Sequence, residues 1–563
     1  MTDSAIPRPH GLAIRWAASL VLLLTALTAP AGAQYTDARL VPRGVLRIGF
    51  EPRYFSFRER FDANGTTEPL GTDFSDSAAG VRLFPTLAEP QTALQSILAD
   101  PLYAVNLGVF RTIRDADIRH FPLTLQFGLS DRLSLTARVP LVTTRSQVEF
   151  SVDSAVGDMG WNQLAEQSGN ATAALQAMQT LFTELEAGAA AVDARIAAED
   201  FGCPSSAECD DARAAVADAR QLVLDLAVLA GVDASGTPGA QITPFAPLTT
   251  SEAGTGLLAA VQDVSTRLAQ FGASPLTATY PLPSAPIGAG GVNEMLADSA
   301  YGYASYPIEF SKYSLNLGDI ELGMRFGVVQ SAWARAVAVG TIRLPTGTLD
   351  EPDHFLDIGT GDRQLDVEVG LEGALEPGSF LGLAGSASYN LQLGHQLVRR
   401  VTRHTAPIAP LATRTTVKRN LGDELRASLY PSLRLSPSFT VYGTAAYYRR
   451  GADDYALTGS PSEGQPLDAA DLAFETSMTS WSFGGGIHYY SRGRTGRGMP
   501  IEAGIDYRAA FSGNGGQTPK YGSVSFYLRL HWRLFGGTQQ PAEPPPPAAE
   551  PESVPEPEPP ARF

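Results

Sequence analysis

Strict alternation of apolar and polar residues recurs along this chain and limits the folds open to it. In VSFYLRLHWRLF, residues 524–535, every second residue is apolar, and Ser, Tyr, Arg or His stand between them. GDIELGMRFGVV (318–329), QLDVEVGLEG (364–373) and IEAGIDYRAAF (501–511) follow the same pattern. Side chains of a strand point alternately to its two faces. Each segment therefore predicts a strand with one apolar face, which contacts either a protein core or lipid.

Three features favour lipid. The segments run for about 10 to 15 residues, longer than most sandwich strands but suited to crossing a bilayer at a tilt. The opposite face is charged and rich in glycine. Aromatic residues recur on the apolar face near strand ends, as membrane-interface girdles do: Phe50, Phe127, Tyr389, Phe439, Tyr447, Trp481, Tyr489 and Trp532. These features predict an outer-membrane β-barrel, with a secreted soluble β protein as the alternative.

The N-terminus carries an export signal. WAASLVLLLTALTAPAGAQ follows Arg8 and Arg15 and ends in Ala31-Gly32-Ala33, the small-residue pattern of signal-peptide cleavage. Residues 1–33 are thus predicted to be removed, leaving Gln34 as the first residue; an uncleaved anchor helix is the alternative.

Charge and cysteine content exclude other classes. The net charge of −17 argues against nucleic acid, whose binding surfaces need clustered Lys and Arg. Cys203 and Cys209 are the two cysteines; in an exported protein they are expected to form a local disulfide. Two cysteines without nearby histidines make half a metal site, so neither a metal nor a cofactor is predicted.

Two further regions interrupt or follow the strands. Apolar residues from Ala171 to Ile196 are spaced alternately four and three apart, which predicts a long helix. A second helix follows from Ala212 and stops at Gly231, and a third ends at Gly272. The Pro/Glu-rich residues 536–563 cannot form a core and predict a disordered spacer; an arm binding a periplasmic or cell-wall partner is the alternative.

Turn lengths give the strand count, because outer-membrane barrels place short turns on the periplasmic side and long loops outside. Short links such as Ser130-Asp131-Arg132 alternate with long ones, which indicates about 12 strands with both termini periplasmic; 10 or 14 strands are the alternatives. The expected spans are 44–60, 117–130, 132–145, 309–328, 333–345, 363–376, 379–393, 422–436, 438–450, 474–490, 500–513 and 521–535. The Ala-rich strand at 333–345 has no register that orients it.

This topology divides the chain into barrel strands at 34–145 and 309–535, separated by an extracellular loop at 146–308 that carries the helical hairpin and third helix. Two placements of the helices are compatible with it: a plug folded into the barrel mouth, or a module displayed on the cell surface. A barrel of this kind needs outer-membrane lipid and the barrel-assembly machinery as partners.

The strands resemble a known family. FGLSDRLSL (127–135), GDIELGMRFGVV (318–329), VAVGTIRLPTG (337–347) and IGTGDRQLDVEVGLEG (358–373) are similar to segments of the outer-membrane barrel family named for the MetA pathway of phenol degradation, often simply called transporters. The resemblance covers about 125–145 and 305–535; the helical insert and the tail depart from the family pattern. It implies uptake of small, often hydrophobic or aromatic compounds.

The lumen is the candidate functional site. No local Ser/His or Asp/His pattern suggests an enzyme, and His488 and His531 are interpreted as lumen residues. Rings of inward charge can select permeants or simply pair to fill a narrow barrel. The candidates are Arg138, Asp319, Glu321, Arg325, Asp366, Glu368, Arg434, Glu502, Asp506, Arg508, Arg529 and Arg533.

Two functions follow from these patterns. The first is a passive channel for small solutes, hydrophobic or aromatic ones included, gated or plugged by the helical insert. The second is a structural or surface-interaction barrel that displays the helical hairpin and transports nothing.

Overall fold

The computed structural model describes residues 38–165, 170–239, 242–378, 380–459, 467–491 and 500–535. The expected signal peptide (1–33) and the Pro/Glu-rich tail (536–563) lie outside the described residues.

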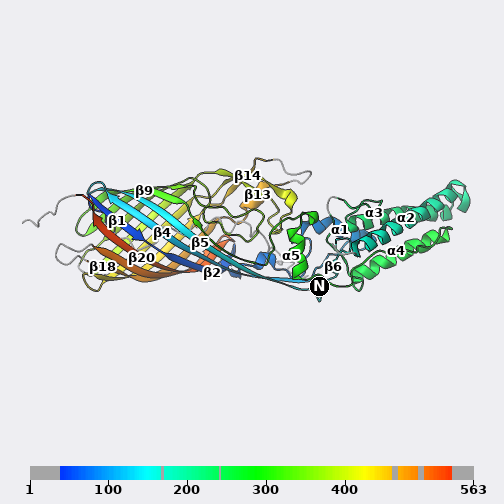
Figure 1. Ribbon diagram of the computed structural model, residues 1–563, viewed down its shortest axis with the longest axis horizontal. Helices are drawn as coiled ribbons and strands as arrows, with labels where there is room; N and C mark the ends of the chain where they lie inside the picture. The colour runs from blue at the N-terminus through cyan, green and yellow to red at the C-terminus, as the bar shows by residue number, and fades with distance from the viewer. Residues whose placement is uncertain are drawn as a thin grey trace, which may run out of the picture.

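Twelve antiparallel strand positions close into a barrel (Figure 1). Two positions are each built from two consecutive strands: β1 (Val45–Phe50) with β2 (Arg53–Phe61), and β8 (Phe310–Leu317) with β9 (Ile320–Gln330). The other ten are β4 (Val109–Gly128), β5 (Leu133–Asp153), β10 (Ala334–Leu344), β11 (Asp366–Leu375), β12 (Leu381–Gln392), β15 (Glu424–Arg434), β16 (Phe439–Arg450), β18 (Met478–Ser491), β19 (Ile501–Asn514) and β20 (Thr518–Arg533). Both β1 and β2 pair with β20 on one side and with β4 on the other, which closes the barrel.

The predicted strand number is therefore confirmed, and the Ser130-Asp131-Arg132 turn joins β4 to β5. Two boundaries differ from expectation: β4 begins at Val109 and β5 continues to Asp153. The additional length forms a two-stranded arm, and its inward side chains Phe110 and Phe150 are buried in the core of the helical insert. Packing beyond the membrane thus extends these two strands.

The barrel exterior is an apolar belt. On β9 the outward Leu322, Met324 and Phe326 are each about half exposed, and the same alternation holds on neighbouring strands. Aromatic pairs mark the belt edges: the ring centroids of Tyr447 and Trp481 lie 4.8 Å apart, and those of Phe439 and Tyr489 lie 5.0 Å apart. A surface this apolar is stable against hydrocarbon and not against water.

The Ala-rich strand β10 is oriented by its neighbours. Val337 is fully buried and Arg343 is 6% exposed, whereas Ile342 is 47% exposed. Residues 335, 337, 339, 341 and 343 therefore face inward.

The hydrogen-bond ladder is interrupted at one level across four neighbouring strand positions. Pro122 of β4 lies directly opposite Pro140 of β5, Pro52 separates β1 from β2, and Gly318 lies in the break between β8 and β9. The Gly318 N–H donates to the Pro140 carbonyl at 2.8 Å; a Cβ at this glycine would lie 2.9 Å from Val142 Cγ2. Because proline has no N–H to donate, the hydrogen-bond ladder has a defect across this part of the wall.

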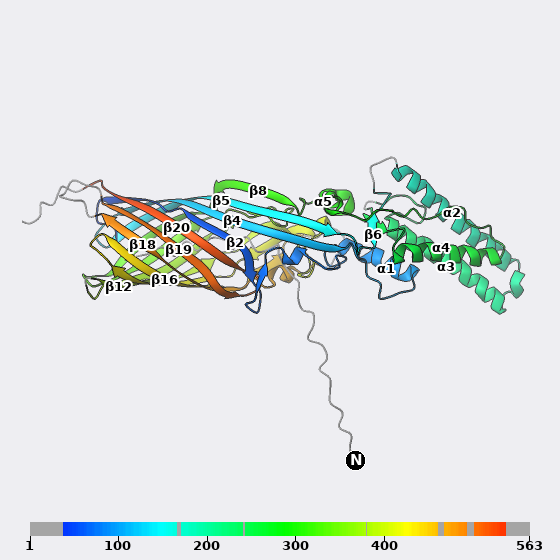
Figure 2. The same ribbon diagram turned by 90° about the horizontal axis from the view of Figure 1, so that it is seen from below.

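The helical insert stands beyond the barrel, at the end of the β4/β5 arm (Figures 1 and 2). It comprises α2 (Asn170–Ala197), α3 (Ala207–Ala230), α4 (Glu252–Gln270) and α5 (Ala289–Ala297), and it packs on α1 (Ala88–Ile97) from the loop between β3 (Thr67–Pro69) and β4. A short β6 (Met159–Trp161) pairs with β7 (Phe245–Pro247) at its base. Cys203 and Cys209 form a disulfide in the turn between α2 and α3. None of the described helices is both long and apolar enough to span a membrane.

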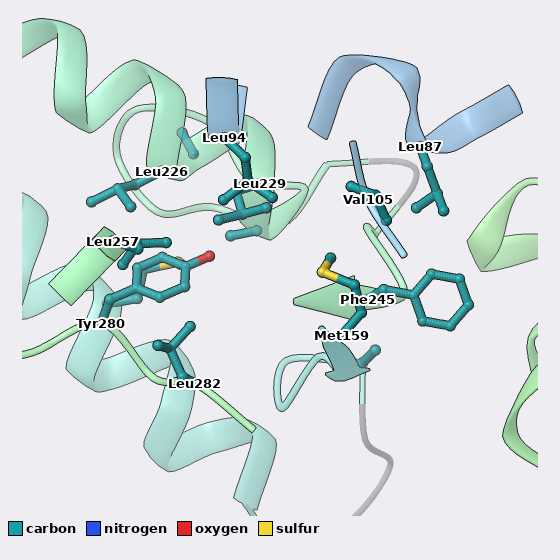
Figure 3. Packing of buried hydrophobic residues seen from close by; sticks show 14 of the residues in the cluster. Leu87, Leu94, Val105, Met159, Leu226, Leu229, Phe245, Leu257, Tyr280 and Leu282 are labelled. Atoms are coloured by element: carbon teal, nitrogen blue, oxygen red, sulfur yellow. The ribbon is translucent and has the colours of Figure 1, made fainter. Parts of the chain in front are cut away.

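The helices share one apolar core. Leu226 and Leu229 of α3 lie with Leu94 of α1 and Leu257 of α4 in this core (Figure 3). Gly231 ends α3 with a left-handed φ of 72°, as the sequence predicted.

A cap covers the end of the barrel beyond which the insert stands. The predicted topology makes this end extracellular and the opposite end periplasmic, and the two ends are named accordingly. The cap consists of the β10–β11 loop and a sheet of β13 (His395–Arg400), β14 (Arg414–Asn420) and β17 (Asp454–Leu457). Phe355, Leu356 and Ile408 of the cap belong to the same core as the helical insert. Cap and insert therefore form one continuous body.

Candidate functional site: the barrel lumen

Side chains alternate between the two faces of each strand, and as a result a column of charged side chains points into the barrel. Ten of the sequence candidates lie on inward positions of their strands: Arg138, Glu321, Arg325, Asp366, Glu368, Arg434, Glu502, Asp506, Arg508 and Arg529. Asp319 is instead at the break between β8 and β9, where its carboxylate accepts N–H bonds from Gly347 at 2.7 Å and Asp362 at 3.1 Å. It holds the β10–β11 loop. Arg533 is exposed at the periplasmic end of β20.

Ion pairs join the inward charges in the extracellular half of the barrel. Arg138 lies 3.2 Å from Glu321. Arg343 lies 2.9 Å from Asp366, and Arg426 lies 3.0 Å from Glu368. These strongly hydrogen-bonded pairs offset the cost of placing charge inside a narrow barrel.

A second network lies on the wall formed by β1, β19 and β20. Arg529 contacts Glu51 at 3.0 Å and Glu502 at 3.3 Å. His531 bonds to Glu502 at 2.9 Å. His488 bonds to the hydroxyl of Tyr527 at 2.6 Å. Both histidines are thus held in lumen hydrogen bonds, which is the role that the sequence predicted for them.

The periplasmic mouth holds arginines from three different segments around one carboxylate. Glu376, just after β11, lies 2.7 Å from Arg434 and 3.9 Å from Arg39, and it also pairs with Arg335. Burial alone would raise the pKa of Glu376, but hydrogen bonds from Arg434 and Arg335 hold that pKa below its ordinary value. Glu376 is therefore ionised at neutral pH.

A segment before the first strand enters this mouth. Ala38 is fully buried and Val41 nearly so. Ala38 packs in a cluster with Val337, Ala374, Ala384, Tyr430 and Tyr442, and Leu40 lies against it. Residues 38–41 thus occupy part of the periplasmic end of the lumen.

Buried arginines hold the extracellular cap in place. Arg400 donates to the carbonyls of Tyr303 at 2.7 Å and Ala409 at 2.9 Å, and pairs with Asp353 at 2.8 Å. Arg399 pairs with Asp350 at 2.7 Å. Such cationic hydrogen bonds to carbonyls and carboxylates are stronger than neutral ones. These two arginines therefore bind the cap to the helical insert and hold the loops of the cap together.

One small chamber lies within the barrel wall. A chamber of about 30 Å³ lies between β12, β15, β16, β18 and β19, enough for roughly one or two waters. Its inward lining is polar: Ser386, Ser388, Ser428, Ser482, Arg426 and Arg508. Larger hollows, of about 760 and 890 Å³, lie beside the β4/β5 arm. Residues 38–41 occupy part of one end of the lumen, and the cap covers the other end.

Sequence reasoning missed several of these residues. Arg335 and Arg343 lie on the Ala-rich strand that alternation could not orient, and Glu376 is the last residue of an expected strand. Ala38 and Arg39 precede the first alternating segment, and no local pattern marks them as lumen residues. Their contacts join positions hundreds of residues apart, and one sequence carries no signal for such contacts.

Comparisons with known proteins give structural matches only. No family model matches the chain, and no curated protein matches it. An outer membrane channel from Pseudomonas putida F1 matches with 8% identity and a TM-score of 0.39, covering 89% of this chain and 100% of that one. A FadL homologue from Pseudomonas aeruginosa (8% identity, TM-score 0.26, covering 87% and 90%) and the Ralstonia pickettii toluene transporter TbuX (8%, 0.26, covering 89% and 92%) also match.

At these values the assignment of the fold rests on the strand pairing of this chain itself. The resemblance to the MetA-pathway family stays a prediction. On its own strand pairing and exterior, this chain is a closed antiparallel β-barrel of the outer-membrane type.

Proposed function

We propose that this protein is a bacterial outer-membrane channel for the passive passage of small solutes. The observation that carries the proposal is a column of charged side chains enclosed by a barrel whose exterior is apolar. Charge of this kind is stable in a bilayer only where it faces water or other charges. Export through a cleaved signal peptide and assembly by the barrel-assembly machinery complete the proposal.

The helical insert regulates passage in this proposal by bracing the cap. Because its helices stand beyond the barrel, the insert acts on the lumen indirectly, through the cap, and not as a plug inside it. Supporting contacts run from Arg400 of the cap to the carbonyls of Tyr303 and Ala304 at the end of the insert. Loss of these bonds would free the loops that cover the extracellular mouth.

Liposome swelling with solutes of graded size tests this function. Vesicles containing the protein should swell in small sugars and amino acids, and faster when residues 160–272 are deleted or Arg400 is replaced by Ala. Denatured protein in matched vesicles is the control. Swelling no faster than in empty vesicles for all three proteins, each verified as folded, would contradict the proposal.

A surface-interaction barrel is the second candidate. It is favoured by one observation, the position of α2, α3 and α4 at the end of a long arm. Protease added to intact cells should then cut the insert while the barrel stays embedded. An insert shielded from protease would contradict display.

A further inference from the structure

One face of the cap sheet carries a row of buried polar side chains. Strands β13, β14 and β17 lie side by side in this sheet, between the barrel and the helical insert (Figure 1). Arg419 of β14 has two direct register partners, His395 on β13 and Tyr455 on β17. Directly opposite residues of a sheet share a face, so these three side chains form one row, called here the cap row. Arg419 is fully buried and Tyr455 is 6% exposed.

The end of β16 lies next to the cap row. Arg450 is the last residue of β16 and is 1% exposed, and Asp453 is 4% exposed. Arg450 Nη2 lies 3.5 Å from Asp453 Oδ1. Burial, and after it the negative charge of Asp453, raises the pKa of Tyr455. The Tyr455 hydroxyl therefore keeps its proton and lies close to the Asp453 carboxylate.

Several polar atoms of this group have no hydrogen-bond partner within the described part of the chain. They are Nε and Nη1 of Arg419, Nε and Nη1 of Arg450, the Tyr455 hydroxyl, Asp453 Oδ2 and His395 Nε2. Buried polar groups in native proteins are nearly always hydrogen-bonded, and water or an ion serves where no protein group is available. So many atoms of this kind at one place indicate a bound polar group.

The arginines here are accompanied by acidic residues, so net charge does not define the place. The pairs are Arg399 with Asp350 at 2.7 Å, Arg450 with Asp453 at 3.5 Å and with the more distant Glu424, and Arg419 with Asp362, whose carboxyl group lies nearby and whose main-chain carbonyl accepts Nη2–H at 2.7 Å. A ligand would instead be recognised by the unused atoms. Two guanidinium groups and a phenol supply donors, and one carboxylate oxygen supplies an acceptor.

We propose that hydrogen phosphate binds between the cap row and the end of β16. Arg419 and Arg450 donate to its charged oxygens, as guanidinium groups do with phosphate, and the Tyr455 hydroxyl donates a third bond. The ligand's own hydroxyl donates to Asp453 Oδ2, which would repel an anion that carries no proton. The bound ligand connects β16 of the barrel with β14 and β17 of the cap, and thereby fastens the cap sheet to the barrel. This site is independent of whether the barrel conducts.

Isothermal titration of the detergent-solubilised full-length protein in phosphate-free buffer tests binding, with inorganic phosphate as the probe. Phosphate should bind saturably. Sulfate has the same shape but no proton at neutral pH, and it should bind at least about tenfold more weakly because it leaves Asp453 without a donor. Absence of saturable phosphate binding would show that water alone satisfies these atoms and would overturn the proposal. Sulfate binding as tight as that of phosphate would overturn it as well.

Substitutions localise the site. Arg419→Gln should weaken phosphate binding about tenfold or more, and Tyr455→Phe, which removes only a hydroxyl, about three- to tenfold. Lys418→Gln, at an exposed position on the other face of β14, is the matched control and should leave binding unchanged. Asp453→Asn should reduce the preference for phosphate over sulfate to about threefold or less, because the amide can donate to either anion. Variants at 419 and 455 that both bind as the control does, or an unchanged preference in D453N, would overturn the proposal.

Hydrogen exchange distinguishes loss of the ligand from loss of the fold. In the wild-type protein phosphate should slow exchange of β13, β14 and β17 at least about threefold and leave α2, α3 and α4 unchanged. Without phosphate, Y455F should exchange as the wild-type protein does, since its ring still packs in the cap. Heat-modifiable migration on gels verifies the barrel of each variant. Equal protection of the wild-type cap by phosphate and by sulfate at one concentration would overturn the proposal without recourse to any variant.

Discussion

The Arg400 guanidinium donates a 2.7 Å hydrogen bond to the carbonyl oxygen of Tyr303. This bond joins the cap over the barrel mouth to the segment that follows α5 of the helical insert. Arg400 is 1% exposed and also bonds to Asp353, Ala304 and Ala409. One buried side chain thereby couples two segments that the sequence places a hundred residues apart.

Arg400→Ala should destabilise the cap by about 1–3 kcal/mol, because it leaves the carbonyls of Tyr303, Ala304 and Ala409 without their donor. Hydrogen exchange of the β13–β14 sheet should rise while exchange of the barrel strands stays slow. Arg403→Ala, an exposed neighbour in the same loop, should change neither. Unchanged protection in R400A would disprove the coupling.

A charge on the lipid face should prevent stable insertion. Leu322 is 47% exposed within the belt, opposite Ala137 and Ile342. Leu322→Arg should cost about 2–4 kcal/mol in urea unfolding from lipid vesicles. Tyr313→Arg, outward on β8 opposite Arg145, lies above the belt and should cost about 0–1 kcal/mol. Equal losses of stability in the two variants would contradict the position assigned to the apolar belt.

Acid should loosen the cap through His395. Burial, followed by the charges of Arg419 and Arg399, lowers the pKa of His395 from 6.5 to about 4. Between those values the unfolded chain binds the proton and the folded cap does not, so cap stability falls as pH drops from 6.5 towards 4. Proteolysis of the cap should accelerate over that range, and less steeply in His395→Gln. An H395Q variant with the wild-type pH profile would assign the effect to another group.

Removal of the disulfide should affect the insert alone. Cys203 and Cys209 close a short loop at the tip of the α2–α3 hairpin. Replacing both by Ser should lower the stability of the hairpin by about 2 kcal/mol through a freer unfolded chain. Limited proteolysis should then cut first near this tip, with the heat-modifiable migration of the barrel preserved. Loss of barrel migration would show that the insert is needed for barrel stability.

Particular residues explain how far the sequence predicted the fold. Alternation at Leu322, Met324 and Phe326 identified the lipid face because each apolar side chain there is large. Strand β10 could not be oriented because its outward residues include Ala336, Ala338 and Gly340, which present almost no apolar surface. The arm was missed because the outward residues of β4 become polar, at Arg111, Asp115 and Arg119, once the strand leaves the belt.

The candidate site was predicted in part for the same reason. Inward charges such as Arg138 and Glu321 follow directly from alternation. The ion pairs at the periplasmic mouth depend on Arg39, Arg335 and Arg434, which meet at Glu376 only after the barrel closes. The position of Ala38 in the lumen depends equally on tertiary packing, since its partners lie on strands far away in the sequence.

Single-channel recording in planar bilayers tests the central claim most directly. The account predicts discrete conductance steps for the purified folded protein, larger steps when residues 38–41 are deleted, and further opening when Arg400 is replaced by Ala. Silent bilayers with the wild-type protein, the deletion and R400A alike, with heat-modifiable migration retained in all three, would contradict a conducting lumen.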